Sequence, residues 1–437
     1  MAVLKKIIVL FIIGTLTLSV LTISNKPLVE RASITPHEVK DAVDNYSYIN
    51  RQLFEIPGLT EIVLNLEDLE SISKASTHLI PYLKTQVQFV SNNLILFASL
   101  DLNNIINNAY INARCILKNT SQSIVDHCYL GKIYIPSFLF EFFVNGFLIV
   151  FQQPNLQDLF EQFLYQSNIT NNKLSFFILK NKNLKQEIKD DAKKIIGNFN
   201  FLNISKRSEI EHEIIADYLY EFILDPSLQG SGSVSLAIVF NRAFTLARKR
   251  SQNSNSVDEN LHALFAVAVC FANPNFIEIL HERELAGVSK IKNLLEVNKF
   301  KLASINGRHD LTLHFLYSAL IEQLTNDKLA FNTGELKELY DAHENAKYFD
   351  FMDITADIAG ASFSKFIASN HKNAEQSQYM LANSTVEHLF FPNTSNYPKN
   401  IKIFVEKNKE FSTDNEDYEL ALDKISKDIR QLRLYQD

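Results

Sequence analysis

The stretch GRHDLTLHFLYSALIEQL, residues 307–324, decides how the C-terminal half of this chain should fold. Apolar residues recur in it at three- and four-residue spacing: Phe315, Leu316, Ala319, Leu320 and Leu324. This spacing predicts a helix with one buried face. Its first turns are polar instead, and Asp310 and His314, four residues apart, share one face of the helix. They either begin a functional site or belong to a well-capped helix start.

Two later segments repeat this combination of carboxylates and small residues on one helix face. In NTGELKELYDAHE, residues 332–344, Gly334, Glu338 and Asp341 have the i, i+4, i+7 spacing of a single face. In FDFMDITADIAGASFSKF, residues 349–366, the same spacing is formed by Asp353, Asp357 and Gly360. An isolated carboxylate is costly inside a helical core. If the three faces meet, positively charged side chains or a bound cation must therefore compensate.

A functional interpretation makes these residues a site between facing helices. His314, Glu338, Asp341 and Asp357 offer the nitrogen and oxygen ligands expected for Zn, Mn or Fe, so a divalent metal is the candidate cofactor. Without a metal, His314 could act as a general base that a carboxylate orients. The catalytic candidates are then His314, Asp310 and Lys337.

A structural interpretation accounts for the same residues. Asp350 and Asp353 would cap the last helix, Lys337 and Asp341 would form a surface pair at i, i+4, and His314 would hydrogen-bond one acid. Each of these pairs is common in helices, and only their recurrence favours a site. The Walker, nucleophile-elbow, dinucleotide-binding and HExxH motifs do not occur in the chain.

The first segment of the chain, MAVLKKIIVLFIIGTLTLSVLTISNKP, predicts its location. Residues 7–23 carry no charge and are almost wholly apolar, and a helix of this length spans about 25 Å, nearly a bilayer core. The segment is a signal anchor or part of a cleaved signal peptide. Because no small-residue cleavage motif follows, we expect residues 1–26 to be a retained signal anchor. Because Lys5 and Lys6 precede it, we expect a single-pass protein of the bacterial inner membrane with its bulk in the periplasm.

The remaining sequence predicts an α+β, predominantly helical protein with three further regions. Residues 27–153 should form an α+β domain, because 83–135 alternates apolar and polar residues as antiparallel strands do and 136–152 reads as a helix. Such a sheet offers an apolar concavity that holds a lipid or is packed shut. Residues 154–230 read as a helical connecting region that ends at a Gly/Ser hinge, 229–235, and 231–437 as a helical C-terminal domain with a strongly apolar helix near 257–272.

Charge and cysteine content narrow the class of partner. The net charge is −7, and the single dense basic run is ARKRSQ at 247–252, so a nucleic-acid partner is not expected. Cys115 and Cys128 lie in neighbouring strand-like segments and could form a disulfide in an oxidising compartment, whereas Cys270 reads as a small core residue.

The three C-terminal segments carry a resemblance to known proteins. The pattern G-R-x-D-L-x-x-H-F, then K-E-L-x-D, then F-x-D-x-x-A-D-x-A-G resembles that of uncharacterised membrane-anchored proteobacterial proteins. A shorter part of it is similar to YfiM-type lipoproteins and, more distantly, to VanZ-like membrane proteins. The chain departs from the pattern at residues 346–348, where a Gly-rich segment is expected. The resemblance implies the envelope location and the grouping of these residues, and it implies no reaction.

Two functions follow as expectations. The first is a membrane-anchored envelope protein without enzymatic activity, which binds a lipid, a cell-wall component or a protein partner through its N-terminal sheet. The second is a metal-dependent or acid–base hydrolase centred on His314 with Glu338, Asp341 and Asp357.

Overall fold

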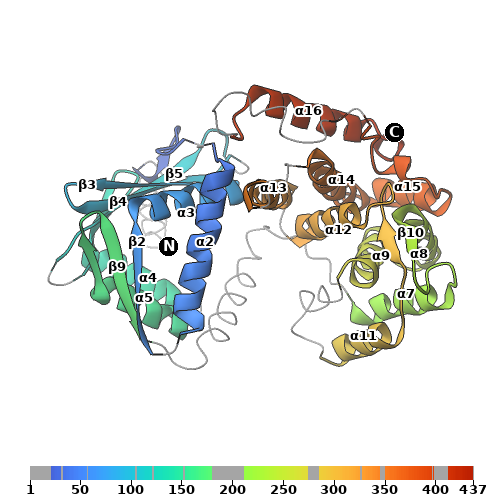
Figure 1. Cartoon of the computed structure of the whole chain (residues 1–437), viewed down its shortest axis with the longest axis horizontal. Helices are drawn as coiled ribbons and strands as arrows, with labels where there is room; N and C mark the ends of the chain where they lie inside the picture. The colour runs from blue at the N-terminus through green and yellow to red at the C-terminus, as the bar shows by residue number, and fades with distance from the viewer. Residues whose placement is uncertain are drawn as a thin grey trace, which may run out of the picture. The chain divides into compact units, whose positions relative to one another are not determined.

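The computed structural model divides the chain into two compact units, residues 1–201 and 202–437 (Figure 1). It describes residues 21–30, 33–56, 58–103, 106–120, 123–150, 153–179, 211–273, 285–324, 327–344, 350–395, 397 and 412–436. Most of the predicted anchor and the departure at 346–348 lie outside these residues. Among the helices within them, none is both long and apolar enough to cross a membrane.

The first unit contains the predicted antiparallel sheet. Its strands are neighbours in chain order: β3 (Leu83–Val90), β4 (Asn93–Asp101), β5 (Tyr110–Leu117), β6 (Val125–Leu130) and β7 (Ile133–Pro136). The short β1 (Ile23–Ser24) also pairs with β5. Ser91 and Asn92 turn the chain between β3 and β4 with positive φ, the conformation that two-residue hairpins require. The alternating pattern of residues 83–135 is thus confirmed.

In the part of this unit that the structure describes, a second, three-stranded sheet and four helices complete the fold. The sheet has the order β2-β9-β8 and is formed by β2 (Leu59–Asn65), β8 (Ser167–Thr170) and β9 (Lys173–Leu179). The helices are α2 (Pro36–Phe54), α3 (Leu66–Leu79), α4 (Ser137–Val150) and α5 (Pro154–Gln166). Thr35 and Glu38 form a capping box at the start of α2, which satisfies backbone N–H groups that the first turn leaves free.

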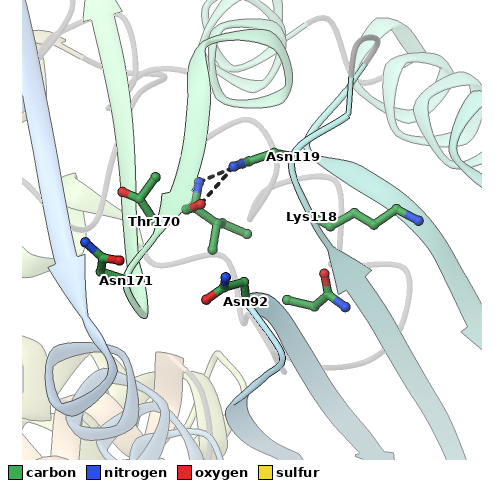
Figure 2. A pocket seen from close by; sticks show the side chains of 7 residues that line it. Asn92, Lys118, Asn119, Thr170 and Asn171 are labelled. Carbon is green, nitrogen blue, oxygen red and sulfur yellow. Dashed lines mark hydrogen bonds between the residues drawn. The ribbon is translucent and has the colours of Figure 1, made fainter.

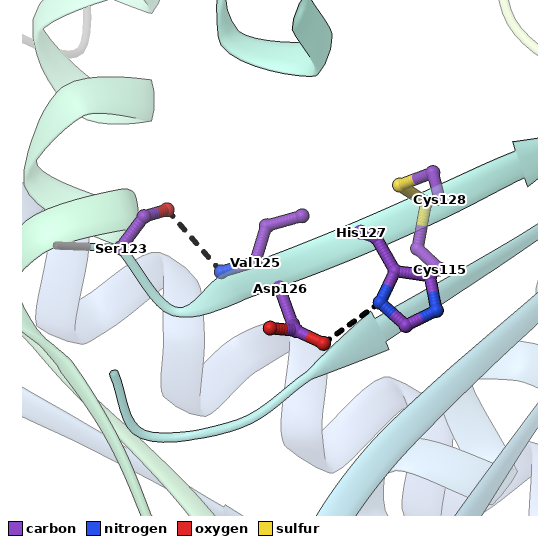
Figure 3. The surroundings of a disulfide bond; sticks show 6 residues. All are labelled: Cys115, Ser123, Val125, Asp126, His127 and Cys128. Carbon is purple, nitrogen blue, oxygen red and sulfur yellow. Dashed lines mark hydrogen bonds and ion pairs between the residues drawn. A yellow bond between two sulfur atoms is a disulfide. The ribbon is translucent and has the colours of Figure 1, made fainter. Parts of the chain in front are cut away.

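One face of the six-stranded sheet is covered by the unit's own side chains. Residues of β3 to β7 pack there against α4, α5 and the β8–β9 hairpin, around a core that includes Val87, Leu94, Leu117, Leu164 and Leu174. Cys115 and Cys128, directly opposite on β5 and β6, form a disulfide at this face (Figure 3). Beside the bridge, His127 hydrogen-bonds Asp126 at 2.7 Å. This face is therefore filled by the protein's own side chains, and this counts against a lipid bound there.

A polar hollow lies instead between the turns of the two sheets (Figure 2). Its volume is about 410 Å³, and its lining is Asn92, Asn93, Lys118, Asn119, Ile169, Thr170 and Asn171. The Asn119 side chain donates to the carbonyl of Ile169 at 2.8 Å and accepts from its N–H at 2.7 Å. Because amide side chains dominate the lining, this hollow does not provide the apolar site that the sequence suggested.

The second unit is mostly helical, as predicted. Its helices are α7 (His212–Leu224), α8 (Leu236–Arg250), α9 (Ser256–Phe271), α11 (Leu285–Val297), α12 (His309–Leu324), α13 (Asp327–Glu344), α14 (Phe351–Ile367), α15 (His371–Ala382) and α16 (Glu416–Arg430). The apolar α9 is buried along nearly its whole length. Aromatic rings join α8, α12 and α14 in the core; Phe240 and Phe363 stack with their centroids 4.8 Å apart, and Phe315 contacts both.

The division of the chain differs from the boundaries expected over 154–230. Residues 154–179 contain α5 and the β8–β9 hairpin and pack into the first unit, because the strands complete the sheet of β2. Helix α7 packs against α9 and α11 in the second unit. The predicted hinge at 229–235 is also internal, since β10 (Ser233–Ser235) pairs in parallel with β11 (Leu302–Ser304). Gly230 and Gly232 lie in the turn before β10 and adopt positive φ, which glycine allows.

Candidate functional site

Close packing of α12, α13 and α14 brings the three predicted faces together, and two glycines allow it. Gly360 of α14 lies against the backbone carbonyl of Phe315 on α12, and Gly334 of α13 lies against the carboxylate of Asp357 on α14. A Cβ at either position would collide with these atoms. Glycine permits such close approach because it has no side chain. The recurrence of small residues beside carboxylates in the sequence therefore has a packing cause.

His314 is held on its Nδ1 side by Asp357. Nδ1 lies 3.2 Å from both carboxylate oxygens of Asp357, and the Ser318 hydroxyl donates to Oδ1 of the same carboxylate at 2.7 Å. Asp357 is buried. A carboxylate in this position accepts a hydrogen bond from Nδ1–H, so in the neutral imidazole the lone pair is on Nε2.

The Nε2 side of His314 faces two further carboxylates. Nε2 lies 3.6 Å from Oε1 of Glu338 on α13 and 3.6 Å from Oδ2 of Asp353 on α14. The three side chains are only 10%, 3% and 12% exposed, respectively. One nitrogen and two oxygens, each from a different helix, thus lie within 4.8 Å of one another.

Two cationic side chains partly neutralise this cluster from its edges. Lys337 Nζ lies 2.8 Å from Glu338 Oε1, 2.9 Å from Asp341 Oδ2 and 3.3 Å from His314 Nε2. Arg308 reaches Asp353 at 2.8 Å and Asp350 at 2.9 Å, and it pairs with Asp310 at 2.7 Å. The Lys337 side chain is 53% exposed, whereas the carboxylate of Glu338 that it neutralises is buried.

Burial and charge shift the titration of the cluster. Burial raises the pKa of Asp353 to about 7, the positive charge of His314 opposes this, and the negative charge of Glu338 adds to it. Burial also raises the pKa of Glu338, against the hydrogen bond from Lys337. For His314, burial alone would lower the pKa, but the hydrogen bond to Asp357 and the charges of Asp357 and Asp353 raise it overall. The raised pKa values of Asp353 and Glu338 thus indicate that His314, Lys337 and Arg308 do not fully offset the cost of burying these carboxylates.

Not all the residues predicted for the site belong to its centre. His314, Glu338 and Asp357 come together, with Asp357 on the Nδ1 side rather than among the converging ligand atoms. Asp310 and Asp341 stand at the exposed edge, where Arg308 and Lys337 bind them. Asp353 was expected as a cap and lies at the centre. Its i, i+4 relation to Asp357 was the sequence signal that could have placed it there.

The structural interpretation is also met in part. Asp350, not Asp353, caps α14 by accepting from the N–H of Met352, and Lys337 and Asp341 form the expected i, i+4 pair. These contacts account for the edge of the cluster. They do not explain why three buried acidic side chains surround a single histidine. Burying these carboxylates costs desolvation free energy unless a further interaction compensates.

Comparison with known proteins identified no relative of this chain. No protein-family model matches the chain, and searches of curated proteins and of solved structures found no significant match. The resemblance to membrane-anchored proteobacterial proteins stays a prediction, and the site is interpreted from its own geometry.

Proposed function

We propose that the second unit binds a divalent transition-metal ion through His314, Glu338 and Asp353. The observation that supports this is the convergence of one imidazole nitrogen and two carboxylate oxygens, from three helices, within 4.8 Å. Ligands that surround one metal at about 2.0–2.2 Å in tetrahedral geometry lie roughly 3.4 Å apart. The separations of 3.6 Å from Nε2 to each oxygen require only a small contraction.

The Nδ1 side of His314 supports the same assignment. Metal-binding histidines commonly donate their second N–H to a carboxylate, which fixes the tautomer and directs the lone pair of the other nitrogen at the ion. Asp357 is placed to do this, and Ser318 in turn orients Asp357. Asp357 is therefore a positioning residue in this proposal.

The chemistry that we propose for the centre is metal-assisted hydrolysis. Three protein ligands leave a coordination position for water, and a divalent metal lowers the pKa of such a water toward neutrality. For a metal to be held there, Lys337, whose side chain is 53% exposed, would have to give up its contacts with Glu338 and His314. A metal-free general base at His314 is less well supported, because Lys337 Nζ already lies 3.3 Å from the nitrogen that would take up the proton.

Metal titration of the full chain tests the binding step. The detergent-purified protein is stripped with a chelator and titrated with Zn²⁺ and Mn²⁺ by calorimetry, with elemental analysis of the complex. We expect about one site per chain. Glu338→Gln should weaken binding by about tenfold or more, since it removes a charged ligand.

Glu335→Gln is the matched control for this titration. Glu335 lies on the same helix, is as buried as Glu338, and hydrogen-bonds the Tyr418 hydroxyl instead of His314. Its substitution should leave metal affinity unchanged. Equal loss in both variants, or no specific binding in the wild type, would reject the metal site. A positive result would justify screening esters, amides and phosphate esters for hydrolysis, with Lys337→Met and Glu338→Gln as comparison variants.

The envelope location is a separate proposal. It is supported by the apolar residues 7–23 behind Lys5 and Lys6 and by the Cys115–Cys128 disulfide, since disulfides persist mainly in oxidising compartments. A protease-protection assay on intact spheroplasts tests it, and cleavage of the bulk of the chain from the outer face is the expected result.

A further inference from the structure

Helix α4 of the first unit exposes a broad apolar face. Phe138, Phe142, Phe143, Phe147 and Ile149 are exposed by 66%, 70%, 60%, 40% and 62%. Phe140 and Leu148 of the same helix pack into the core. Soluble surfaces rarely expose contiguous apolar residues on this scale, and such patches mark contact with a protein or a membrane.

The exposed face of α4 carries no charged side chain. The helix, SFLFEFFVNGFLIV, has a single ionisable residue, Glu141. Its carboxylate accepts a hydrogen bond from the Tyr165 hydroxyl of α5 at 2.9 Å, so it is directed at the neighbouring helix. A protein partner that recognises a face specifically would be expected to find polar groups at its rim. A face of phenylalanine and isoleucine alone suits the acyl boundary of a lipid bilayer.

The chain holds this face close to the point where its first apolar segment ends. Leu21 accepts a hydrogen bond from the N–H of Lys132 at 2.8 Å, at the turn between β6 and β7. Gly131 in this turn has positive φ, and a Cβ there would collide with the backbone of Leu21 and Thr22. The four residues of β7, about 13 Å at strand spacing, are all that separate Lys132 from Ser137 at the start of α4.

We propose that α4 lies in the surface of the same bilayer that residues 7–23 anchor, with its Phe138–Ile149 face among the lipid acyl chains. The inference rests on the proposed anchor and is independent of the metal site. Lys132 and Tyr134, which are exposed at the approach to α4, have the headgroup-level chemistry that flanks membrane-embedded segments. The first unit is thus attached at two points, and its orientation on the membrane is fixed.

Single-tryptophan variants test this in the full chain, which has no tryptophan of its own. Phe142→Trp and Ile149→Trp report from α4, and Tyr46→Trp on α2 is the matched control because Tyr46 and Phe142 are both 70% exposed. Each variant is reconstituted into vesicles of phosphatidylethanolamine and phosphatidylglycerol, with and without brominated acyl chains. Circular dichroism and melting temperature establish that each variant folds as the wild type does.

We expect the fluorescence of Phe142→Trp and Ile149→Trp to fall about twofold or more in brominated vesicles, and that of Tyr46→Trp to remain unchanged. Emission from both α4 variants that aqueous iodide quenches and brominated lipid does not would overturn the proposal. Emission that neither agent quenches would also overturn it, because protein, from a second copy or another segment of the chain, then covers the face.

Discussion

The imidazole of His314 on α12 and the carboxylate of Asp357 on α14 form one hydrogen-bonded unit, with Nδ1 lying 3.2 Å from each carboxylate oxygen. Gly334 of α13 packs directly against this carboxylate. The orientation of the histidine thus depends on all three helices. If the cluster holds a metal, the carboxylate should govern affinity without touching the ion.

Asp357→Asn should therefore weaken metal binding while it preserves the shape of the site. The amide oxygen of Asn can accept a hydrogen bond from Nδ1–H but lacks the negative charge, and loss of such a partner typically costs 10–100-fold in affinity. Calorimetric titration with Zn²⁺ measures the effect. Ser364→Ala, which removes a buried hydroxyl of the same helix that bonds Gln323, serves as the control and should bind metal normally. Comparable affinity in wild type and Asp357→Asn would contradict the positioning role.

Lys337→Met should have opposite effects in the two states of the protein. Without metal, it removes the ammonium that neutralises Glu338 and Asp341, at 2.8 Å and 2.9 Å, so the melting temperature should fall. With metal, the competing cation next to Nε2 is gone, and the affinity for Zn²⁺ should rise by about tenfold. Thermal melts with and without Zn²⁺ give both quantities. A variant that is destabilised equally in both conditions would show that Lys337 only supports the fold.

The stability of the metal-free protein should fall as pH rises from 5 to 8. The pKa of Asp353 is raised to about 7, so between its ordinary value and 7 the folded chain binds a proton that the unfolded chain lacks. The free energy of unfolding then decreases with pH, by up to about 1.4 kcal/mol per pH unit. The raised pKa of His314 acts in the same direction. Its contribution is full below the ordinary histidine value and is lost as pH rises through the folded value.

Comparison of variants isolates this effect from other groups. Burial lowers the pKa of His262, which contributes a slope of the opposite sign near pH 6, so the informative quantity is the difference between wild type and Asp353→Asn. Urea unfolding at each pH should give a flatter profile for Asp353→Asn. Asp341→Asn, at the exposed edge of the same network, should retain the wild-type slope. Equal slopes in the wild type and Asp353→Asn would refute the assignment.

Three helical glycines should respond differently to alanine. Gly360→Ala places a Cβ against the backbone carbonyl of Phe315, which cannot move without shifting a helix, so we expect destabilisation of about 2 kcal/mol or more. Gly334→Ala displaces the Asp357 carboxylate and should lower metal affinity as well as stability. Gly146→Ala meets no atom within 4 Å and should stabilise α4 by about 0.5–1 kcal/mol. Chemical unfolding measures the change in unfolding free energy for each variant. An unchanged stability of Gly360→Ala would contradict the close contact between α12 and α14.

The disulfide should stabilise the first unit. It closes a loop with a sequence separation of 13 residues, which is expected to contribute about 3 kcal/mol by limiting the unfolded chain. Cys115→Ala with Cys128→Ala should therefore lower the unfolding midpoint of this unit, whereas Cys270→Ala, in the second unit, should leave it unchanged. An unaltered midpoint in the double variant would show that the bridge does not form in the native protein.

The sequence by itself determined the elements whose cause is local. Alternating residues predicted the strands of 83–135, apolar periodicity predicted α12, and a strongly apolar run predicted α9. Spacing of i, i+4 also placed His314, Glu338, Asp341 and Asp357 on the polar faces of their own helices, although it could not show that these faces meet. Within 154–230 the prediction missed the β8–β9 hairpin, which is stabilised by pairing with β2, a strand more than 100 residues away in the chain.

Only the tertiary structure decided which side chains form the centre of the cluster. Spacing treats Asp353, Asp341 and Asp310 alike, since each lies on a predicted polar face. Their environments differ because Gly334 and Gly360 set the close packing of α12, α13 and α14, which buries Asp353 beside His314 and leaves the other two at the solvent with Lys337 and Arg308. Periodicity along one helix carries no information about the distance between helices. That distance is set by contacts between residues far apart in sequence, and it is what separates a ligand from a surface ion pair.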